Sequence, residues 1–180
     1  MDKTEQPSWF RNAIQNEPER LFVRVKGIKI AYNAWGEKEN PGILFVHGGM
    51  AHADWWNFIA PYFIKTHRVI AMNLGGMGDS EWRKEYSTET WGIEIESVCK
   101  KEKLKKPIVV GHSLGGMCGV YAASIMKRNL YGLIIVDTAI MPPSDKPPKF
   151  DFKIRANKIY KNQKEIKSRF RLVPGQVNAL

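Results

Sequence analysis

The sequence places a serine between two glycines at a spacing that suits nucleophilic catalysis. Residues 111–115 read Gly-His-Ser-Leu-Gly, directly after the apolar run 107–110 and before a helical pattern at 114–127. A serine on such a tight strand-to-helix turn takes a strained backbone geometry, and side chains two positions away would clash with it. The pattern therefore predicts that Ser113 is a nucleophile. The alternative interpretation is a serine that only caps the helix.

A second glycine-rich segment could supply the hydrogen-bond donors that acyl transfer needs. Residues 47–50 read His-Gly-Gly-Met and follow the apolar run 42–46. Two N–H groups must point at the oxyanion that forms when a serine attacks a carbonyl. We expect these donors to be the backbone N–H groups of Gly49 and of Leu114, the residue after the serine. The alternative is an ordinary strand-to-helix turn.

Three further residues near these segments are candidates for weaker roles. Met50 and His112 adjoin the expected oxyanion donor and the nucleophile, so they are candidate substrate-binding residues. His47 is interpreted as a structural residue that hydrogen-bonds to the backbone of its own loop, and not as a general base.

The elements that must position these residues alternate along the chain. Residues 21–25 and 28–32 alternate apolar and polar side chains around Lys26 and Gly27, which predicts a β-hairpin. Continuous apolar runs, typical of strands buried on both faces, lie at 42–46, 68–72, 107–110 and 133–136. Helical patterns separate them: one capped by Asp54 and reaching Phe63, one opened by residues 87–90, and one at 114–127. The sequence therefore predicts an α/β fold with a mostly parallel sheet, flanking helices and an N-terminal antiparallel hairpin at one edge.

The two ends of the chain differ from this pattern. Residues 1–20 are polar and predict a loose arm or a short helix. From Pro142 onward, paired prolines interrupt regular structure. Asn162 with Glu165 three residues later resembles a capping box, which would open a short helix with Ile166 and Phe170 on one face.

Together these motifs resemble the α/β-hydrolase superfamily, specifically single-domain hydrolases with a helical cap. The resemblance covers residues 21–174 and rests on the loop at 47–49, the elbow at Ser113, the strand at 133–138 and a glycine-rich loop at 73–80. In that last loop the family often reads D-x-x-G-x-G-x-S. This chain departs from the family there at Asn73, Gly75 and Met77.

The resemblance implies a catalytic triad in the chain order serine, acid, histidine. All four histidines of this chain precede Ser113, and Asp137 is the one acid that follows a predicted core strand directly. We therefore expect Asp137 to be a candidate acid, and a chain that is incomplete at its C-terminus. The expected division is an arm at 1–20, the first part of the core at 21–143 and the start of the cap at 144–180.

The function implied is that of a serine hydrolase acting on a small ester, thioester or C–C bond substrate through an acyl-enzyme. Little activity is expected of the 180 residues, because no histidine follows the serine. An aspartate nucleophile is disfavoured because position 113 is serine. The alternative is a non-catalytic protein of the same fold that binds a partner. An uncovered apolar edge near Ile134 would make the chain poorly soluble or oligomeric.

Composition narrows the function classes further. The net charge is +10, from 28 basic and 18 acidic residues, and residues 144–180 contribute 10 basic against 3 acidic side chains. Without a nucleic-acid motif, this charge indicates a solvated surface rather than a nucleic-acid site. No apolar stretch reaches the ~20 residues of a membrane span, and the first residues contain no apolar h-region, so we expect no secretory signal. We expect a cytoplasmic protein without metal or organic cofactor, acting on a small molecule; the oligomeric state stays open.

Overall fold

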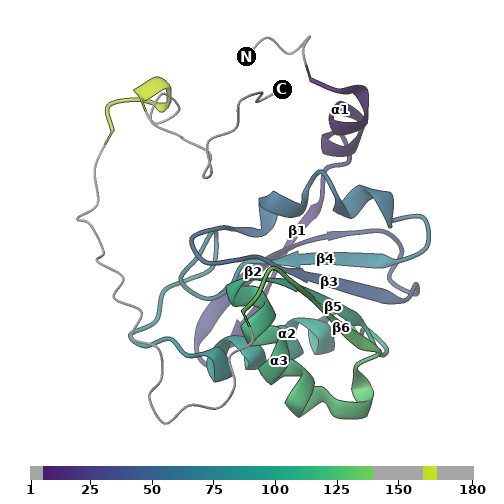
Figure 1. The fold of residues 1–180 in the computed structure, drawn as a ribbon, viewed down its shortest axis with the longest axis vertical. Coiled ribbons are helices and arrows are strands. Elements are labelled where there is room, and N and C mark those ends of the chain that lie inside the picture. The colour runs from purple at the N-terminus through teal and green to yellow at the C-terminus, as the bar shows by residue number, and fades with distance from the viewer. Residues whose placement is uncertain (1–5, 140–159, 166–180) are drawn as a thin grey trace. The chain divides into compact units, whose positions relative to one another are not determined.

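The computed structural model describes residues 6–139 and 160–165. The chain divides into two compact units, 1–141 and 142–180, which are treated separately below. The first unit is built around a six-stranded sheet in the order β1-β2-β4-β3-β5-β6 (Figure 1). The strands are β1 (Glu19–Val25), β2 (Ile28–Trp35), β3 (Gly42–Val46), β4 (Arg68–Met72), β5 (Ile108–His112) and β6 (Gly132–Val136).

The sheet is mostly parallel, as the sequence predicts. β4, β3, β5 and β6 run parallel to one another, whereas β2 pairs antiparallel with both β1 and β4. The turn between β1 and β2 consists of Lys26 and Gly27, both with positive φ values of 47° and 86°. A two-residue turn of this kind matches the twist of the strands that it joins. The predicted hairpin is therefore confirmed.

Apolar side chains cover both faces of the central strands. On one face of β3, Leu44 and Val46 join a core with α2 (Thr88–Lys101) and α3 (Leu114–Met126). On the other face, Ile43 and Phe45 pack with the residues around Trp56. Alternate side chains of a strand point to opposite faces. Burial of both faces explains why β3 reads as an uninterrupted apolar run.

The segment after β3 is not the single capped helix that was predicted over residues 54–63. It forms two short 3₁₀ turns, η2 (Ala53–Trp56) and η3 (Ala60–Tyr62). The Asp54 carboxylate caps no helix and instead accepts hydrogen bonds from the side-chain amides of Asn33 and Asn57. Pro61 has no N–H with which to continue a helical ladder. The apolar pattern of this segment thus reflects burial against the sheet.

The helices predicted to open at residues 87–90 and to span 114–127 are confirmed. Ser87 caps α2 by accepting the N–H of Thr90 at 3.2 Å. The polar N-terminal segment contains a short helix, α1 (Ser8–Ile14), and the 3₁₀ turn η4 (Lys127–Asn129) follows α3. In the part of the chain that the structure describes, none of these helices is long and apolar enough to traverse a membrane.

The second unit is described only at residues 160–165. There the N–H of Glu165 donates to the side-chain oxygen of Asn162 at 3.0 Å, so the predicted capping interaction is present. Ile166, Phe170 and most of the proposed cap, 144–180, lie outside the described residues. The division into arm, core and cap therefore stays a prediction.

Candidate active site

Ser113 lies on the turn that joins β5 to α3, at the carboxyl edge of the parallel strands. Its φ and ψ are 49° and −116°, a conformation that residues with a side chain rarely adopt. Two hydrogen bonds hold the turn: the N–H of Ser113 donates to the carbonyl of Val136, and its carbonyl accepts the hydroxyl of Thr138, both at 3.0 Å. The strained geometry expected from the sequence is therefore present.

The two glycines around Ser113 are required by close backbone approach. A Cβ atom on Gly115 would lie 2.5 Å from the carbonyl oxygen of Val46 at the end of β3. A Cβ atom on Gly111 would meet the carbonyl oxygen of Gly115. Only glycine lets α3 begin this close to the sheet, as the G-x-S-x-G spacing implies.

In the loop after β3, hydrogen bonds to the Gly48 carbonyl orient the peptide between Gly48 and Gly49. The carbonyl of Gly48 accepts two hydrogen bonds, from Nδ1 of His47 at 2.7 Å and from the N–H of Ala51 at 3.3 Å. In a trans peptide the C=O and the following N–H point in opposite directions. The N–H of Gly49 therefore faces away from His47. Met50 follows with a φ of 56° and an exposed side chain.

His47 itself is buried, and its hydrogen bonds define its tautomer. The carbonyl of Gly48 can only accept, so Nδ1 carries the proton; Nε2 then accepts the N–H of Leu74 at 3.1 Å. Burial lowers the pKa of His47 to about 4, and the nearby imidazoles of His52 and His112 also lower it. His47 therefore stays neutral at pH 7 and joins two loops.

This shift predicts a loss of stability in acid. Between pH 6.5 and 4 the unfolded chain binds a proton at His47 that the folded chain does not, so the free energy of unfolding falls as pH falls. We expect a loss of about 2.5 kcal/mol from this residue by pH 4.5. Urea unfolding of His47→Gln should show a correspondingly smaller difference between pH 7 and pH 4.5. His67→Gln, which removes an imidazole bonded to the Thr66 hydroxyl, should leave that difference unchanged; an equal change in both variants would contradict the assignment.

The glycine-rich loop at residues 73–80 is fixed by polar contacts despite its departures from the family pattern. The side-chain oxygen of Asn73 accepts the N–H of Ala53 at 2.7 Å, which links this loop to the segment after β3. Buried Glu94 accepts the N–H of Gly75 at 2.8 Å and pairs with Arg83. An amide oxygen at position 73 is thus sufficient to hold the loop.

The predicted oxyanion donors come together beside Ser113. A Cβ atom on Gly49 would lie 4.0 Å from Cδ2 of Leu114, so the two residues are neighbours although they are 65 positions apart. Neither the N–H of Gly49 nor that of Leu114 donates to another described residue. Both groups are available to a ligand, and the second lies at the N-terminus of α3, where negative charge is favoured.

His112 and Asp137 form a contact that sequence reasoning did not connect. The His112 ring packs against the backbone of Gly48, and its Nε2 lies 4.0 Å from Oδ2 of exposed Asp137. His112 and Val136 are partners in the β5–β6 register, so the residue after Val136 must reach this edge. The β5–β6 register is the signal from which the contact between His112 and Asp137 could have been predicted. Nδ1 of His52 lies 3.8 Å from Oδ2 of a different acid, Asp54.

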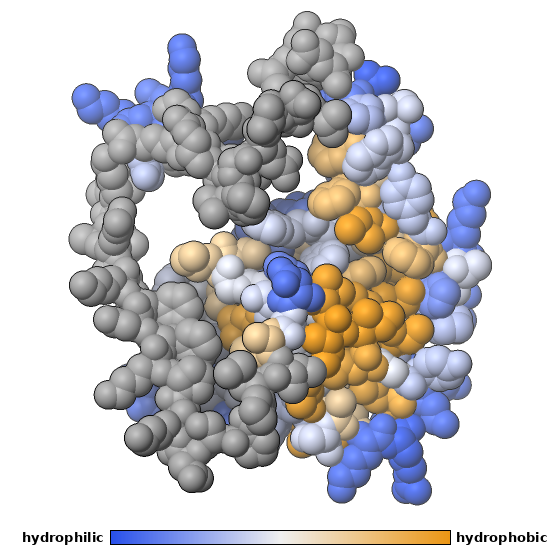
Figure 2. Space-filling model, viewed as in Figure 1, coloured by the Kyte–Doolittle hydropathy of each residue, from blue (hydrophilic) through white to orange (hydrophobic). Residues whose placement is uncertain are grey.

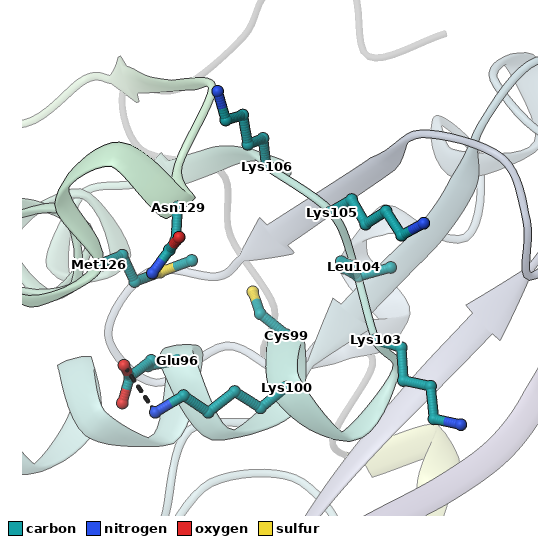
Figure 3. A pocket seen from close by; sticks show the side chains of 9 residues that line it. All are labelled: Glu96, Cys99, Lys100, Lys103, Leu104, Lys105, Lys106, Met126 and Asn129. Carbon is teal, nitrogen blue, oxygen red and sulfur yellow. Dashed lines mark ion pairs between the residues drawn. The ribbon is translucent and has the colours of Figure 1, made fainter.

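A separate cavity of about 390 Å³ lies at the opposite edge of the sheet, where α2 and α3 end. Cys99 and Met126 reach toward its interior, while the amines of Lys103, Lys105 and Lys106 point away from one another (Figure 3). Lys100 is paired with Glu96 at 2.8 Å. Burial raises the pKa of the Cys99 thiol to about 12, so it is not a nucleophile at pH 7. This cavity shows neither a reactive thiol nor lysines that converge on one anion.

Comparison with known proteins agrees with the fold. Residues 41–170 match the family model described as alpha/beta hydrolase fold. The chain is 26% identical over 121 residues to human "Epoxide hydrolase 4", covering 64% of this chain and 33% of that protein. It is 29% identical over 132 residues to human "Serine hydrolase-like protein", covering 72% and 65%.

A solved structure, "Thioesterase Domain From Curacin Biosynthetic Pathway", superposes with a TM-score of 0.65 at 28% identity, covering 72% of this chain and 50% of that one. The chain thus spans between one third and two thirds of the length of these relatives. Within the described residues, no three His, Cys, Asp or Glu side chains gather as a metal site would require. The elbow, the sheet order and the family match over most of its length establish that this chain belongs to the α/β hydrolase fold family.

Proposed function

We propose that this chain carries the nucleophile and the oxyanion-binding groups of a serine hydrolase. The observation that carries the proposal is the strained position of Ser113 beside two unengaged N–H groups, those of Gly49 and Leu114. A strained, half-buried serine next to two unengaged backbone donors suits attack on a carbonyl. Similarity to hydrolases over most of the chain supports the same reaction class.

The proposed reaction forms an acyl-enzyme. Ser113 Oγ bonds to the carbonyl carbon of the substrate, and the oxyanion that results accepts the N–H groups of Gly49 and Leu114. When the carbonyl reforms, the bond to the leaving group breaks and that group departs with a proton. Water then attacks the acyl group and releases the acid. His47 contributes by fixing the Gly48 carbonyl, which orients the N–H of Gly49.

The proposed substrates are small esters, thioesters or compounds with an activated C–C bond. The likeness to a thioesterase domain and to a serine hydrolase-like protein supports a carbonyl substrate. Epoxide opening by an aspartate nucleophile is disfavoured, because position 113 is serine. The serine proton needs an acceptor, and no histidine among the described residues hydrogen-bonds to the Ser113 hydroxyl. We therefore propose that the 180 residues turn substrate over slowly.

A fluorophosphonate probe tests the proposal without needing turnover. The folded chain should be labelled on Ser113, and Ser113→Ala should lose all labelling because the attacking oxygen is gone. Ser124→Ala is the matched control: its hydroxyl lies on the same helix and donates to the carbonyl of Tyr121. Labelling should survive in that variant. Equal labelling of the wild type and Ser113→Ala, checked by peptide mass spectrometry, would overturn the proposed nucleophile.

The second candidate function is a non-catalytic protein that uses the same two backbone N–H groups to bind an acyl compound. The observation that favours it is that no histidine among residues 6–139 hydrogen-bonds to the Ser113 hydroxyl. Absence of labelling in a wild-type sample that is folded by circular dichroism would support this candidate over the hydrolase.

A further inference from the structure

Side chains of α2 hold both backbone groups of Gly75, in the loop that follows β4. Oε2 of Glu94 accepts the Gly75 N–H at 2.8 Å, and Nε1 of Trp91 donates to the Gly75 carbonyl at 3.1 Å. The absence of a side chain at position 75 makes room for these contacts, since a Cβ atom would lie 2.7 Å from Oε1 of Glu94 and 3.3 Å from Nε of Arg83. The helix therefore fixes the backbone at this point of the loop.

Glu94 is fully buried and takes its counter-charge from Arg83, a residue outside the helix. Among the described residues, the Arg83 side chain bonds to Glu94 alone, through Oε1, and it is 11% exposed. Burial raises the pKa of Glu94, while the Gly75 N–H and the Arg83 charge lower it. A buried ion pair adds little net stability compared with apolar packing. Its clearer effect here is to hold the carboxylate in one orientation, with Oε2 directed at Gly75.

The residue before Gly75 connects this loop to His47. The N–H of Leu74 donates to Nε2 of His47 at 3.1 Å, and Nδ1 of His47 donates to the Gly48 carbonyl at 2.7 Å. The Leu74 carbonyl and the Gly75 N–H belong to one planar peptide, so a displacement of that peptide also moves the Leu74 N–H. A short hydrogen-bonded path therefore leads from the α2 carboxylate to the peptide after Gly48.

We propose that Glu94 and Arg83 are positioning residues for the oxyanion donor of Gly49. This role rests on the proposed function, which assigns that N–H group to the oxyanion. Both side chains act through the loop after β4 and through His47, and neither is a catalytic residue. A displacement of about 1 Å at a reacting centre can cost a factor of about 100 in rate, so a small shift of this loop is sufficient to slow the reaction.

The kinetics of fluorophosphonate labelling test this role in the 180-residue chain. A carboxylate accepts from both Arg83 and Gly75, whereas the amide of Glu94→Gln has one oxygen and turns an NH₂ group toward one of these donors. Glu94→Gln should therefore lower the rate constant for labelling of Ser113 at saturating probe about tenfold, part of the roughly 10²–10³-fold that a whole oxyanion donor contributes. The fraction labelled at completion should stay near that of the wild type, because a purely structural loss would lower that fraction instead.

Substitutions of Arg83 provide a loss and a rescue. Arg83→Met removes the counter-charge of a buried carboxylate and should slow labelling by a similar factor. Arg83→Lys should restore most of the rate, because the contact with Glu94 involves a single guanidinium nitrogen that an ammonium group can replace.

Two controls separate positioning from stability and from adventitious binding. Arg68→Met also breaks a buried arginine–glutamate pair, but at the start of β4, the end of the strand opposite this loop. It should leave the rate constant of the folded fraction within about twofold of the wild type. The probe carries a short alkyl chain, because apolar side chains exposed over β5 and β6 (Figure 2) would bind a long one away from Ser113.

Nitrogen NMR of the imidazoles follows the same path without the probe. Glu94→Gln should shift the Nε2 resonance of His47, because this atom accepts the Leu74 N–H. The resonances of His67, whose ring bonds to the Thr66 hydroxyl, should not change and serve as the internal reference.

The outcomes separate this role from the proposed function. An unchanged His47 resonance or wild-type labelling kinetics in Glu94→Gln would overturn the role, and so would an equal slowing in Arg68→Met. In each of these cases labelling of Ser113 would still support the nucleophile. A folded wild type that is not labelled would overturn the proposed function, and the role at Gly49 with it.

Discussion

Arg68→Met is expected to lower the free energy of unfolding by about 3–5 kcal/mol, since it would break a buried ion pair by removing one partner. Arg68 opens β4, and its side chain is only 1% exposed. It bonds to Glu102 at 2.8 Å, to Glu19, and to the carbonyl of Gly36 at 2.9 Å. The carboxylate of Glu102 is 7% exposed, so without Arg68 its charge would be left with little solvent.

Urea unfolding of a matched pair of variants checks this effect. Arg24→Met removes an exposed pair with Glu81 at 3.7 Å and should cost less than about 1 kcal/mol. The double variant Arg68→Met with Glu102→Gln should recover part of the loss, because no unpaired carboxylate remains. A loss at Arg68 no larger than that at Arg24 would show that the network contributes nothing beyond surface charge.

Gly115→Ala is expected to cost about 2–3 kcal/mol, near the upper part of the range for overpacked sites. The added methyl would lie 2.5 Å from the carbonyl oxygen of Val46 and 2.6 Å from that of His47. Both are backbone atoms of the strand and loop that lead to Gly49, the proposed oxyanion donor, so they cannot move aside as a flexible side chain can. The same displacement should slow fluorophosphonate labelling of Ser113.

Gly132→Ala is the control for this substitution, because a Cβ atom there meets nothing within 4 Å. Thermal unfolding followed by circular dichroism should place it within about 0.5 kcal/mol of the wild type, as for other surface changes. Similar losses in the two variants would mean that glycine at 115 is needed for backbone flexibility and not for close approach.

Sequence reasoning was strongest where the determining residues are neighbours along the chain. The hairpin, the strands and the turn at Ser113 each depend on a pattern of a few residues, and all are present. The prediction that the strand at 133–136 is buried on both faces is wrong, because Ile134 and Val136 of β6 are exposed. The helix predicted over 54–63 is wrong because Asp54 bonds to Asn33, a residue of another strand. The apolar pattern of a segment does not show which distant side chain will compete for its cap.

The polar network of the fold was not predictable for the same reason. Arg68 stands at the head of an apolar run, and its partners Glu19 and Glu102 lie 49 and 34 residues away. His47 was interpreted correctly as structural, but its acceptance of the Leu74 N–H depends on two loops that meet only in the fold. Hydrogen bonds across loops are set by strand order, which no local pattern encodes.

That strand order also bears on how the molecule folds. β3 lies between β4 and β5, both of which come later in the chain, so its pairing waits for residues up to 112. The turn at Ser113 then waits for β6, since Val136 accepts its N–H. Contacts that span long stretches of chain slow folding, while the β1–β2 hairpin can form locally. Ser113, the proposed nucleophile, should thus acquire its geometry late. The rate at which fluorophosphonate labelling develops during refolding would then report the completion of the sheet.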